Sequence, residues 1–123
     1  MNPPERRIGF IGLGAMGEPM AASLRRAGFS VTACAHRRRE PLERLQALGV
    51  ETAPDPAAVA RASEIAIICV PDAPQVEEVL FGERGIAAGA HAGTLVVDAS
   101  TISPVASRGF ADRLARADVS FVD

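Results

Sequence analysis

A glycine-rich segment near the start of the chain has a spacing that could hold phosphate groups. Gly12, Gly14 and Gly17 form the pattern G-x-G-x-x-G, directly after the apolar run Ile8–Ile11 and before a helical pattern. In that context the glycines allow a tight turn, a close approach of the backbone to a pyrophosphate, and close packing of the helix on the strand. The free N–H groups and the positive dipole end of the helix attract anions. The pattern therefore predicts a nicotinamide dinucleotide site; the alternative is a structural turn whose glycines are incidental.

A basic run farther along the chain bears on which dinucleotide binds. NAD sites usually carry an acidic residue at the end of the second strand, whereas NADP sites carry arginine nearby. No acidic residue occurs between Glu18 and Glu40, and the second apolar run continues into His36-Arg37-Arg38-Arg39. Basic charge just before a helix opposes the helix dipole, which favours a bound anion there. The run predicts NADP(H) in preference to NAD(H); the alternative is a solvated basic segment, and at least one arginine is expected to be only that.

The order of apolar runs and helical patterns indicates how these residues are positioned. Strands are expected at Ile8–Ile11, Val31–Ala35, Val50–Ala53, Ile65–Val70, Leu95–Asp98 and Ser120–Val122. Helices are expected from about Ala15 with Met16, Met20, Leu24 and Ala27 on one face, at Pro41–Leu48, from Asp55 to about Ala62, at Gln75–Leu80 and at Ser103–Arg116, with a connection at Gly82–Gly93. This βα alternation predicts an α/β fold: a Rossmann doubly wound parallel sheet of about six strands with flanking helices. Ile65–Val70 is apolar throughout, as expected for a central strand covered on both faces.

Composition narrows the class of protein further. The 123 residues are the size of one domain, with 48% hydrophobic residues and a net charge of −2, so no nucleic-acid partner is expected. No run reaches the roughly 18 apolar residues of a membrane span, so no membrane partner is expected either. Cys34 and Cys69 lie in apolar runs without ligand spacing. They predict buried, reduced thiols in a cytoplasmic protein and no metal site.

Three motifs resemble the β-hydroxyacid dehydrogenases, the family of 3-hydroxyisobutyrate dehydrogenase, which is related to 6-phosphogluconate dehydrogenase. The segment Gly9–Ala21 looks like the opening signature of that family, Val70–Leu80 resembles its segment after the fourth strand, and Asp98–Pro104 is similar to its D-x-S-T-x-x-P motif. The three occur in the family's order over essentially the whole chain. The resemblance implies the NAD(P)-binding domain of an oxidoreductase that transfers hydride to or from a small 3-hydroxy acid or semialdehyde.

The resemblance also implies roles for individual positions. The cofactor pyrophosphate would be held by Gly12, Leu13, Gly14, Ala15, Met16 and Gly17, and the adenosine ribose surrounded by His36, Arg37 and Arg38. Val70 and Pro71 would pack on the cofactor, Val76 would lie near the adenine, Thr101 would contact the nicotinamide side and Ser100 would bind the carboxylate end of the substrate. Many members read N-R-T where this chain has Ala35-His36-Arg37, so the individual ligand of the 2′-phosphate stays open. A structural account also exists for the last motif, with Ser103 as helix N-cap and Pro104 as first helical residue, but it leaves Ser100 and Thr101 unused.

The catalytic acid–base group is expected to lie outside these residues. The resemblance implies a second, all-α domain that supplies a catalytic lysine and much of a homo-oligomer interface. The chain has 13 arginines and no lysine, and His36 and His91 are not credible proton donors. Residues 1–123 are therefore expected to be a truncated cofactor domain, with no catalytic residue and no turnover alone. The competing hypotheses are a non-catalytic dinucleotide-binding module and the cofactor domain of an imine reductase.

Overall fold

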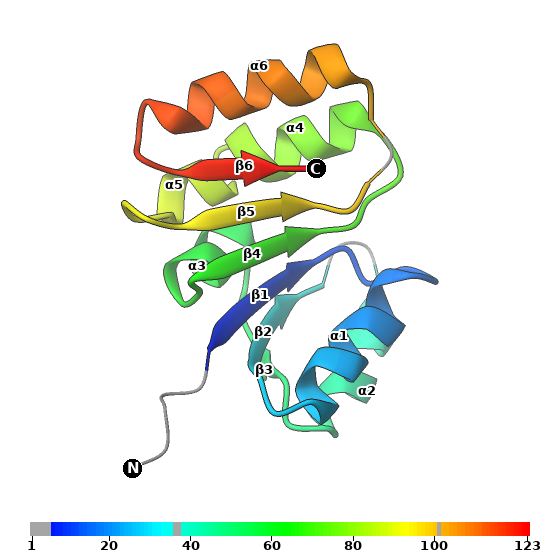
Figure 1. Cartoon of the computed structure of the whole chain (residues 1–123). Helices are drawn as coiled ribbons and strands as arrows, with labels where there is room; N and C mark the ends of the chain where they lie inside the picture. Colours follow the sequence, from blue (N-terminus) through cyan, green and yellow to red (C-terminus); the bar gives the residue numbers. More distant parts are fainter. Residues whose placement is uncertain (1–5, 36–37, 101) are drawn as a thin grey trace.

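The computed structural model describes residues 6–35, 38–100 and 102–123 as one six-stranded parallel sheet with helices on both faces (Figure 1). The strands are β1 (Arg7–Ile11), β2 (Ser30–Cys34), β3 (Glu51–Thr52), β4 (Ile65–Ile68), β5 (Leu95–Asp98) and β6 (Ser120–Val122). The helices are α1 (Gly17–Arg26), α2 (Glu40–Gln46), α3 (Pro56–Arg61), α4 (Ala73–Phe81), α5 (Ile86–Gly89) and α6 (Pro104–Ala115). The expected α/β Rossmann fold is confirmed.

The strand order β3-β2-β1-β4-β5-β6 explains where a ligand can bind. The chain winds outward from β1 in one direction through β2 and β3, and then from β4 to β6 in the other. Ile11, the last residue of β1, pairs with Cys34 of β2 and with Ile68 of β4. Ligands of such sheets bind beyond the carboxyl ends of the strands where the order reverses, which here is between β1 and β4.

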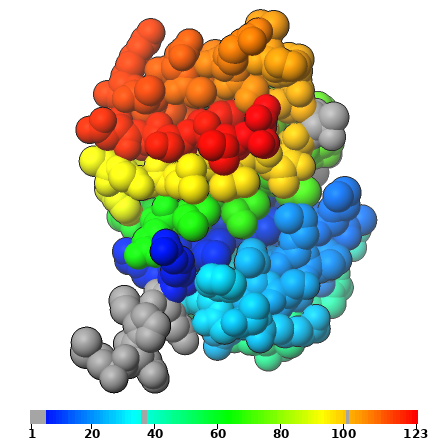
Figure 2. All heavy atoms as spheres, viewed as in Figure 1, coloured from blue at the N-terminus to red at the C-terminus, as the bar shows by residue number. Residues whose placement is uncertain are grey.

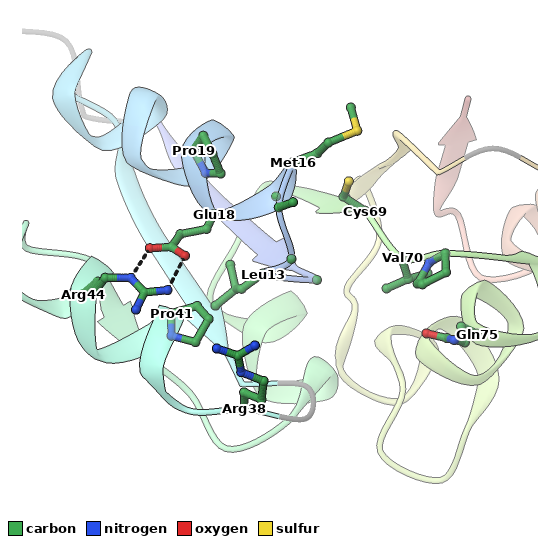
Figure 3. Close-up of a pocket in the computed structure, with 15 residues that line it drawn as sticks. Leu13, Met16, Glu18, Pro19, Arg38, Pro41, Arg44, Cys69, Val70 and Gln75 are labelled. Atoms are coloured by element: carbon green, nitrogen blue, oxygen red, sulfur yellow. Dashed lines mark hydrogen bonds and ion pairs between the residues drawn. The ribbon is translucent and has the colours of Figure 1, made fainter.

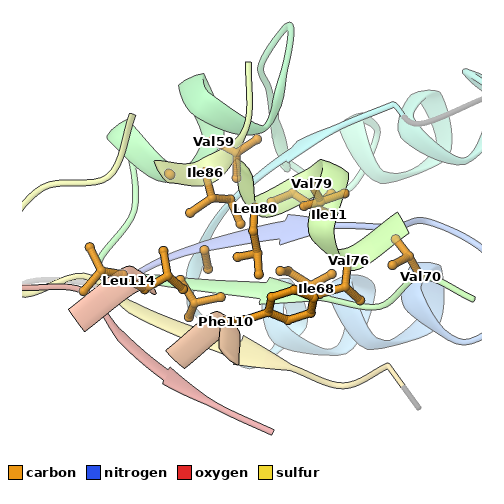
Figure 4. Packing of buried hydrophobic residues seen from close by; sticks show 14 of the residues in the cluster. Ile11, Val59, Ile68, Val70, Val76, Val79, Leu80, Ile86, Phe110 and Leu114 are labelled. Atoms are coloured by element: carbon orange, nitrogen blue, oxygen red, sulfur yellow. The ribbon is translucent and has the colours of Figure 1, made fainter. Parts of the chain in front are cut away.

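Each face of the sheet has its own core, because side chains alternate along a strand. Phe10 points to the α1 and α2 side, whereas Ile11 joins the larger cluster under α3 to α6. Figure 4 shows Leu80, Phe110 and other side chains of these helices packed over β1 and β4. Gly9 makes room for this layer, since a Cβ there would lie 2.5 Å from Val59 Cγ1 of α3. A valine at position 9 would therefore displace α3.

Side-chain caps fix the starts of three helices on that face. The carboxylate of Asp55 accepts a hydrogen bond from the backbone N–H of Ala58 at 2.9 Å and caps α3. The carboxylate of Asp72 accepts one from the backbone N–H of Gln75 at 3.1 Å and caps α4. Ser103 Oγ accepts one from Ala106 at 3.2 Å and starts α6, as expected from the sequence. Each such cap contributes about 1 kcal/mol. The long connection expected at Gly82–Gly93 contains one short helix, α5.

Helix α1 packs by its small residues. The sequence placed Met16, Met20, Leu24 and Ala27 together on one face, but the residues that α1 buries are Gly17, Ala21 and Ala22, while Met16 is 69% exposed. Small residues let the helix axis approach the sheet closely, so the small-residue side rather than the large apolar side packs there. Met20 and Leu24 instead line a shallow hollow beside Ile67 of β4.

The fourth strand also departs from the expectation of full burial. Ala66 and Ile68 are completely buried, but Ile65 and Ile67 are half-buried. The reason is that α1 and α2 pack against β1, β2 and β3 rather than over β4. Figure 2 shows atoms of β4, β5 and β6 reaching the surface beside α1.

Within the described ranges, no helix is long and apolar enough to cross a bilayer.

Candidate cofactor site

A cavity of about 680 Å³ opens at the carboxyl edge of the sheet, at the point where the strand order reverses. One wall is the glycine-rich turn between β1 and α1, a second is formed by α2, and a third follows β4 (Figure 3). It is lined by Gly12, Leu13, Gly14, Ala15, Met16, Gly17, Glu18, Pro19, Arg38, Pro41, Arg44, Cys69, Val70, Pro71 and Gln75. Its volume is in the range of small-molecule and cofactor sites.

Each of the three glycines in the turn has a different structural role. Gly12 has a φ of +103°, and a side chain there would collide with the carbonyl oxygen of Cys69. A side chain on Gly17 would collide with the carbonyl oxygen of Gly12. A Cβ on Gly14 would meet nothing within 4 Å. Gly14 therefore leaves space open at the cavity wall, and the turn fits a ligand that must approach the backbone closely.

The start of α1 is free to bind an anion. Its N-cap residue is Met16, which makes no side-chain hydrogen bond, in contrast to the capped starts of α3, α4 and α6. In α1 the N–H groups of Glu18 and Met20 donate to the carbonyls of Gly14 and Met16, and Pro19 has no N–H. Among the described residues, the N–H groups from Gly14 to Gly17 have no backbone partner, and the helix dipole makes that end positive. Together with the open space at Gly14, this geometry fits a pyrophosphate.

The α2 side of the cavity carries a charged cluster. Arg44 donates two hydrogen bonds to the carboxylate of Glu18, from Nε to Oε2 at 2.6 Å and from Nη2 to Oε1 at 2.7 Å. The hydrogen bond from Arg44 holds the pKa of Glu18 below its usual range, and the charges of Arg44 and Arg38 act in the same direction. Arg38 Nε also lies 3.8 Å from Glu40 Oε2. The guanidinium groups of Arg38 and Arg44 thus face the same cavity.

The turn after β5 is tied to the end of β4. Ser100 Oγ accepts a hydrogen bond from the N–H of Val70 at 2.8 Å, and Asp98 Oδ1 accepts one from the N–H of Ser100 at 2.8 Å. Asp98 is 3% exposed, and its Oδ2 has no hydrogen-bond partner among the described residues. Burial raises the pKa of the Asp98 carboxyl. This network fixes Val70 at the cavity wall.

Most residues expected at the site lie together. The residues from Gly12 to Gly17 line the cavity with Arg38, Val70 and Pro71. Val76 does not line it: its side chain is completely buried in the core beneath α4, because it falls on the inward face of that helix. Ser100 is not in the lining either but lies behind Val70, to which it is bonded. The predictions for His36, Arg37 and Thr101 lie outside the described residues.

Several lining residues were not expected from the sequence. They are Glu18, Pro19, Pro41, Arg44, Cys69 and Gln75. A signal existed for two of them, since Pro41 and Arg44 are three residues apart in α2, which places them on one side of that helix. Cys69 was expected to be buried but is half-buried, because β4 ends at Ile68 and the chain then borders the cavity. Cys34 is buried as expected, and both thiols are free.

The glycine turn, the uncapped helix and the cavity at the reversal of strand order together define a Rossmann-type dinucleotide-binding domain. Residues 7–123 match the model of the family described as the NAD binding domain of 6-phosphogluconate dehydrogenase, and the chain belongs to this family. It is a dinucleotide-binding domain of the hydroxyacid dehydrogenase type, as the three sequence motifs indicated.

Relatives and solved structures agree with this assignment. The chain is 45% identical over 119 residues to 2-hydroxy-3-oxopropionate reductase of Escherichia coli K12, covering 95% of this chain and 39% of the relative. It is 43% identical to L-threonate dehydrogenase of Cupriavidus necator, covering 90% of this chain and 36% of the relative. The crystal structure of 3-hydroxyisobutyrate dehydrogenase from Salmonella typhimurium superposes with a TM-score of 0.87 at 30% identity, covering 95% of this chain and 40% of that one. The chain therefore spans about two fifths of the length of the proteins it resembles.

Proposed function

We propose that the chain is the NADP(H)-binding domain of an oxidoreductase that transfers hydride to or from a small 3-hydroxy acid or semialdehyde. The observation that carries the proposal is the pair of arginines, Arg38 and Arg44, on the cavity wall that continues from β2. No acidic residue lies between Glu18 and Glu40 to bind a ribose 2′-hydroxyl instead. Two arginines on this wall, with no acidic residue in the sequence directly after β2, favour a 2′-phosphate.

In this proposal each part of the chain binds one part of the cofactor. The N–H groups at Gly14 to Gly17 bind the pyrophosphate, with the positive end of α1 behind them. Arg38 binds the 2′-phosphate, and Arg37 and His36 remain predictions for the same end. Val70 and Pro71 pack on the cofactor, held by the hydrogen bond to Ser100. When bound, the nicotinamide supplies or accepts the hydride.

The substrate class is supported by what the relatives are named for. Two of them are a 2-hydroxy-3-oxopropionate reductase and an L-threonate dehydrogenase, and a third is a 3-sulfolactaldehyde reductase of Escherichia coli, 40% identical over 103 residues. All three names describe oxidation or reduction of small hydroxylated acids or aldehydes. These names support an enzyme parent over a non-catalytic module. Because the 123 residues contain no lysine, a lysine acting as acid–base group would come from another part of the parent protein.

A structural neighbour supports the choice of cofactor. Psf3, solved in complex with NADP+ and 2-OPP, superposes with a TM-score of 0.85 at 31% identity, covering 93% of this chain and 40% of that one. An imine reductase from a Pseudomonas species also shares the fold at 25% identity, so imine reduction is kept as the second candidate reaction. A panel of 3-hydroxy acids, semialdehydes and cyclic imines, assayed with the parent protein, separates the two reactions.

The cofactor preference can be tested on the chain itself. Calorimetric titrations of the chain with NADPH and with NADH should show tighter binding of NADPH. A charge-assisted contact to the 2′-phosphate predicts a difference of about tenfold or more. Equal affinities, or tighter binding of NADH, would contradict the proposal.

A further inference from the structure

The ion pair between Glu18 and Arg44 joins α1 and α2 on one side of the cavity. Glu18 belongs to the first turn of α1 and directly follows Gly17, whereas Arg44 belongs to α2. The carboxylate uses both of its oxygens on one edge of the guanidinium, at 2.6 and 2.7 Å (Figure 3). Both residues line the cavity, so an anionic ligand bound there would meet the pair.

The charges of the cavity wall make Glu18 an unusual neighbour for phosphates. Among the described lining residues it is the one acid, facing the two cations Arg38 and Arg44. A carboxylate in the first turn of a helix is favoured by the same helix dipole that attracts a pyrophosphate. Glu18 and a bound cofactor would therefore compete for the same positive groups, namely the arginines and the start of α1. Each would weaken the electrostatic attraction between these groups and the other.

The pair is accessible to an incoming ligand. The side chains of Arg44 and Glu18 are 58% and 24% exposed, so solvent and a bound anion can reach the guanidinium. A guanidinium has five N–H donors, of which Glu18 engages two. A phosphate dianion carries more charge than a carboxylate and more acceptor oxygens. It can therefore recruit the remaining donors of Arg44, or compete with Glu18 for the two donors that Glu18 engages.

We propose that Arg44 is a ligand of the 2′-phosphate of NADP(H) together with Arg38, and that Glu18 is its internal competitor. Arg44 is then a specificity-determining residue that the motif at the end of β2 does not contain. Glu18 occupies the guanidinium in the free protein and lowers the affinity for the phosphorylated cofactor. This inference rests on the proposed NADP(H) preference.

The test compares the affinities of variants for NADPH and NADH by calorimetry. Arg44→Gln should weaken NADPH binding about tenfold and leave NADH binding within about threefold, because only the first ligand carries the 2′-phosphate. Arg44→Lys keeps the positive charge but not the paired N–H donors of the guanidinium. It should therefore retain part of the preference for NADPH over NADH. Glu18→Gln should tighten NADPH binding by about three- to tenfold and raise the ratio of the two affinities.

Controls separate this effect from a general change of charge or folding. Arg61→Gln removes one positive charge from α3, outside the cavity lining, and should change neither affinity. Adenosine 2′,5′-bisphosphate and adenosine 5′-monophosphate serve as probes that differ only in the 2′-phosphate, and they should respond to Arg44→Gln as NADPH and NADH do. Thermal unfolding checks that each variant is folded before its affinity is compared.

The outcomes distinguish the inference from the function on which it rests. If the unmodified protein binds NADH as tightly as NADPH, the proposed cofactor preference is wrong. If it prefers NADPH but folded Arg44→Gln keeps that preference, or loses both ligands equally, Arg44 is not the 2′-phosphate ligand. If Glu18→Gln weakens NADPH binding or leaves it unchanged, Glu18 is not a competitor.

Discussion

Ser100 Oγ lies 2.8 Å from the N–H of Val70, a contact between residues 30 positions apart that joins the turn after β5 to the end of β4. Val70 is buried and lines the cofactor cavity, so the hydroxyl of Ser100 determines where that part of the wall lies. A residue expected to contact substrate therefore also has a structural role behind the site.

Removing this contact should weaken both the fold and the site. Ser100→Ala leaves the Val70 N–H without its partner, which costs about 1–3 kcal/mol of unfolding free energy. Urea unfolding measures the loss, and calorimetry measures the accompanying decrease in cofactor affinity. Ser103→Ala is the matched control, because it removes only the cap of α6, costs about 1 kcal/mol and should leave cofactor affinity unchanged. Equal effects of the two variants on affinity would argue against a positioning role for Ser100.

The glycines of the turn should separate into two classes when each is changed to alanine. Gly14→Ala should fold normally and lose cofactor affinity, because its Cβ meets no protein atom within 4 Å but would enter the space that we propose for the pyrophosphate. Gly17→Ala should lower stability, because its Cβ collides with the carbonyl oxygen of Gly12. Thermal unfolding and NADPH titration of both variants check the distinction. Unimpaired NADPH binding by Gly14→Ala would place the pyrophosphate elsewhere.

The buried carboxyl of Asp98 should give the fold a recognisable pH dependence. Burial raises its pKa above the ordinary value of 3.8, so the folded state binds this proton more tightly than the unfolded state does. The resulting stabilisation is complete below the unfolded pKa and is lost as pH rises through the folded pKa. Asp98→Asn keeps an acceptor for the Ser100 N–H but cannot titrate. The free energy of unfolding of wild type minus that of Asp98→Asn should therefore fall as pH rises from about 3 to 7.

Denaturant unfolding at stepped pH measures this difference. The subtraction removes the contributions of the other carboxyls, which both proteins share. A constant difference over the whole range would show that Asp98 titrates alike in the folded and unfolded states. A difference that rises with pH would show that a favourable interaction of the carboxylate outweighs its burial.

The sequence predicted the sheet and the glycine turn well because both depend on local patterns. Short apolar runs alternate with helical segments, and the G-x-G-x-x-G spacing falls between the first strand and helix. What the sequence did not show is which side of α1 packs inward, since close approach through Ala21 and Ala22 outweighs the larger stripe of Met20 and Leu24. The sequence also did not show that Val76, which the resemblance assigns to the adenine end, faces the core rather than the cavity, because a resemblance does not say which way a helical residue faces. Its place near the adenine stays a prediction.

The charged part of the site was hidden for a different reason. Glu18 and Arg44 are 26 positions apart, and nothing in the intervening sequence indicates that α1 and α2 bring them within hydrogen-bonding distance. Arg44 could be placed on the same side of α2 as Pro41 from helical periodicity alone. Its partner could not, because the contact depends on how α1 and α2 pack together. Tertiary contacts of this kind require the structure.

The two cysteines should report cofactor binding by their different reactivities. Cys34 is buried on β2, and burial, with a contribution from the charge of Asp55, raises the pKa of its thiol to about 11. Since the thiolate is the reactive form, Cys34 should react with a maleimide only when the protein unfolds. Cys69 lines the cavity and is half-buried, and burial together with the charge of Asp98 raises its pKa as well. It should react slowly near neutral pH, faster at higher pH, and more slowly again when NADPH fills the cavity.

Mass spectrometry of labelled peptides follows the two thiols separately. Cys69→Ser should abolish labelling of the folded protein, whereas Cys34→Ser should leave it unchanged. Adenosine 5′-monophosphate, which lacks the pyrophosphate and nicotinamide parts, should protect Cys69 less than NADPH does. If saturating NADPH leaves the labelling rate of Cys69 unchanged, the cofactor does not cover the end of β4. In that case the ligand lies only along the glycine turn and α2.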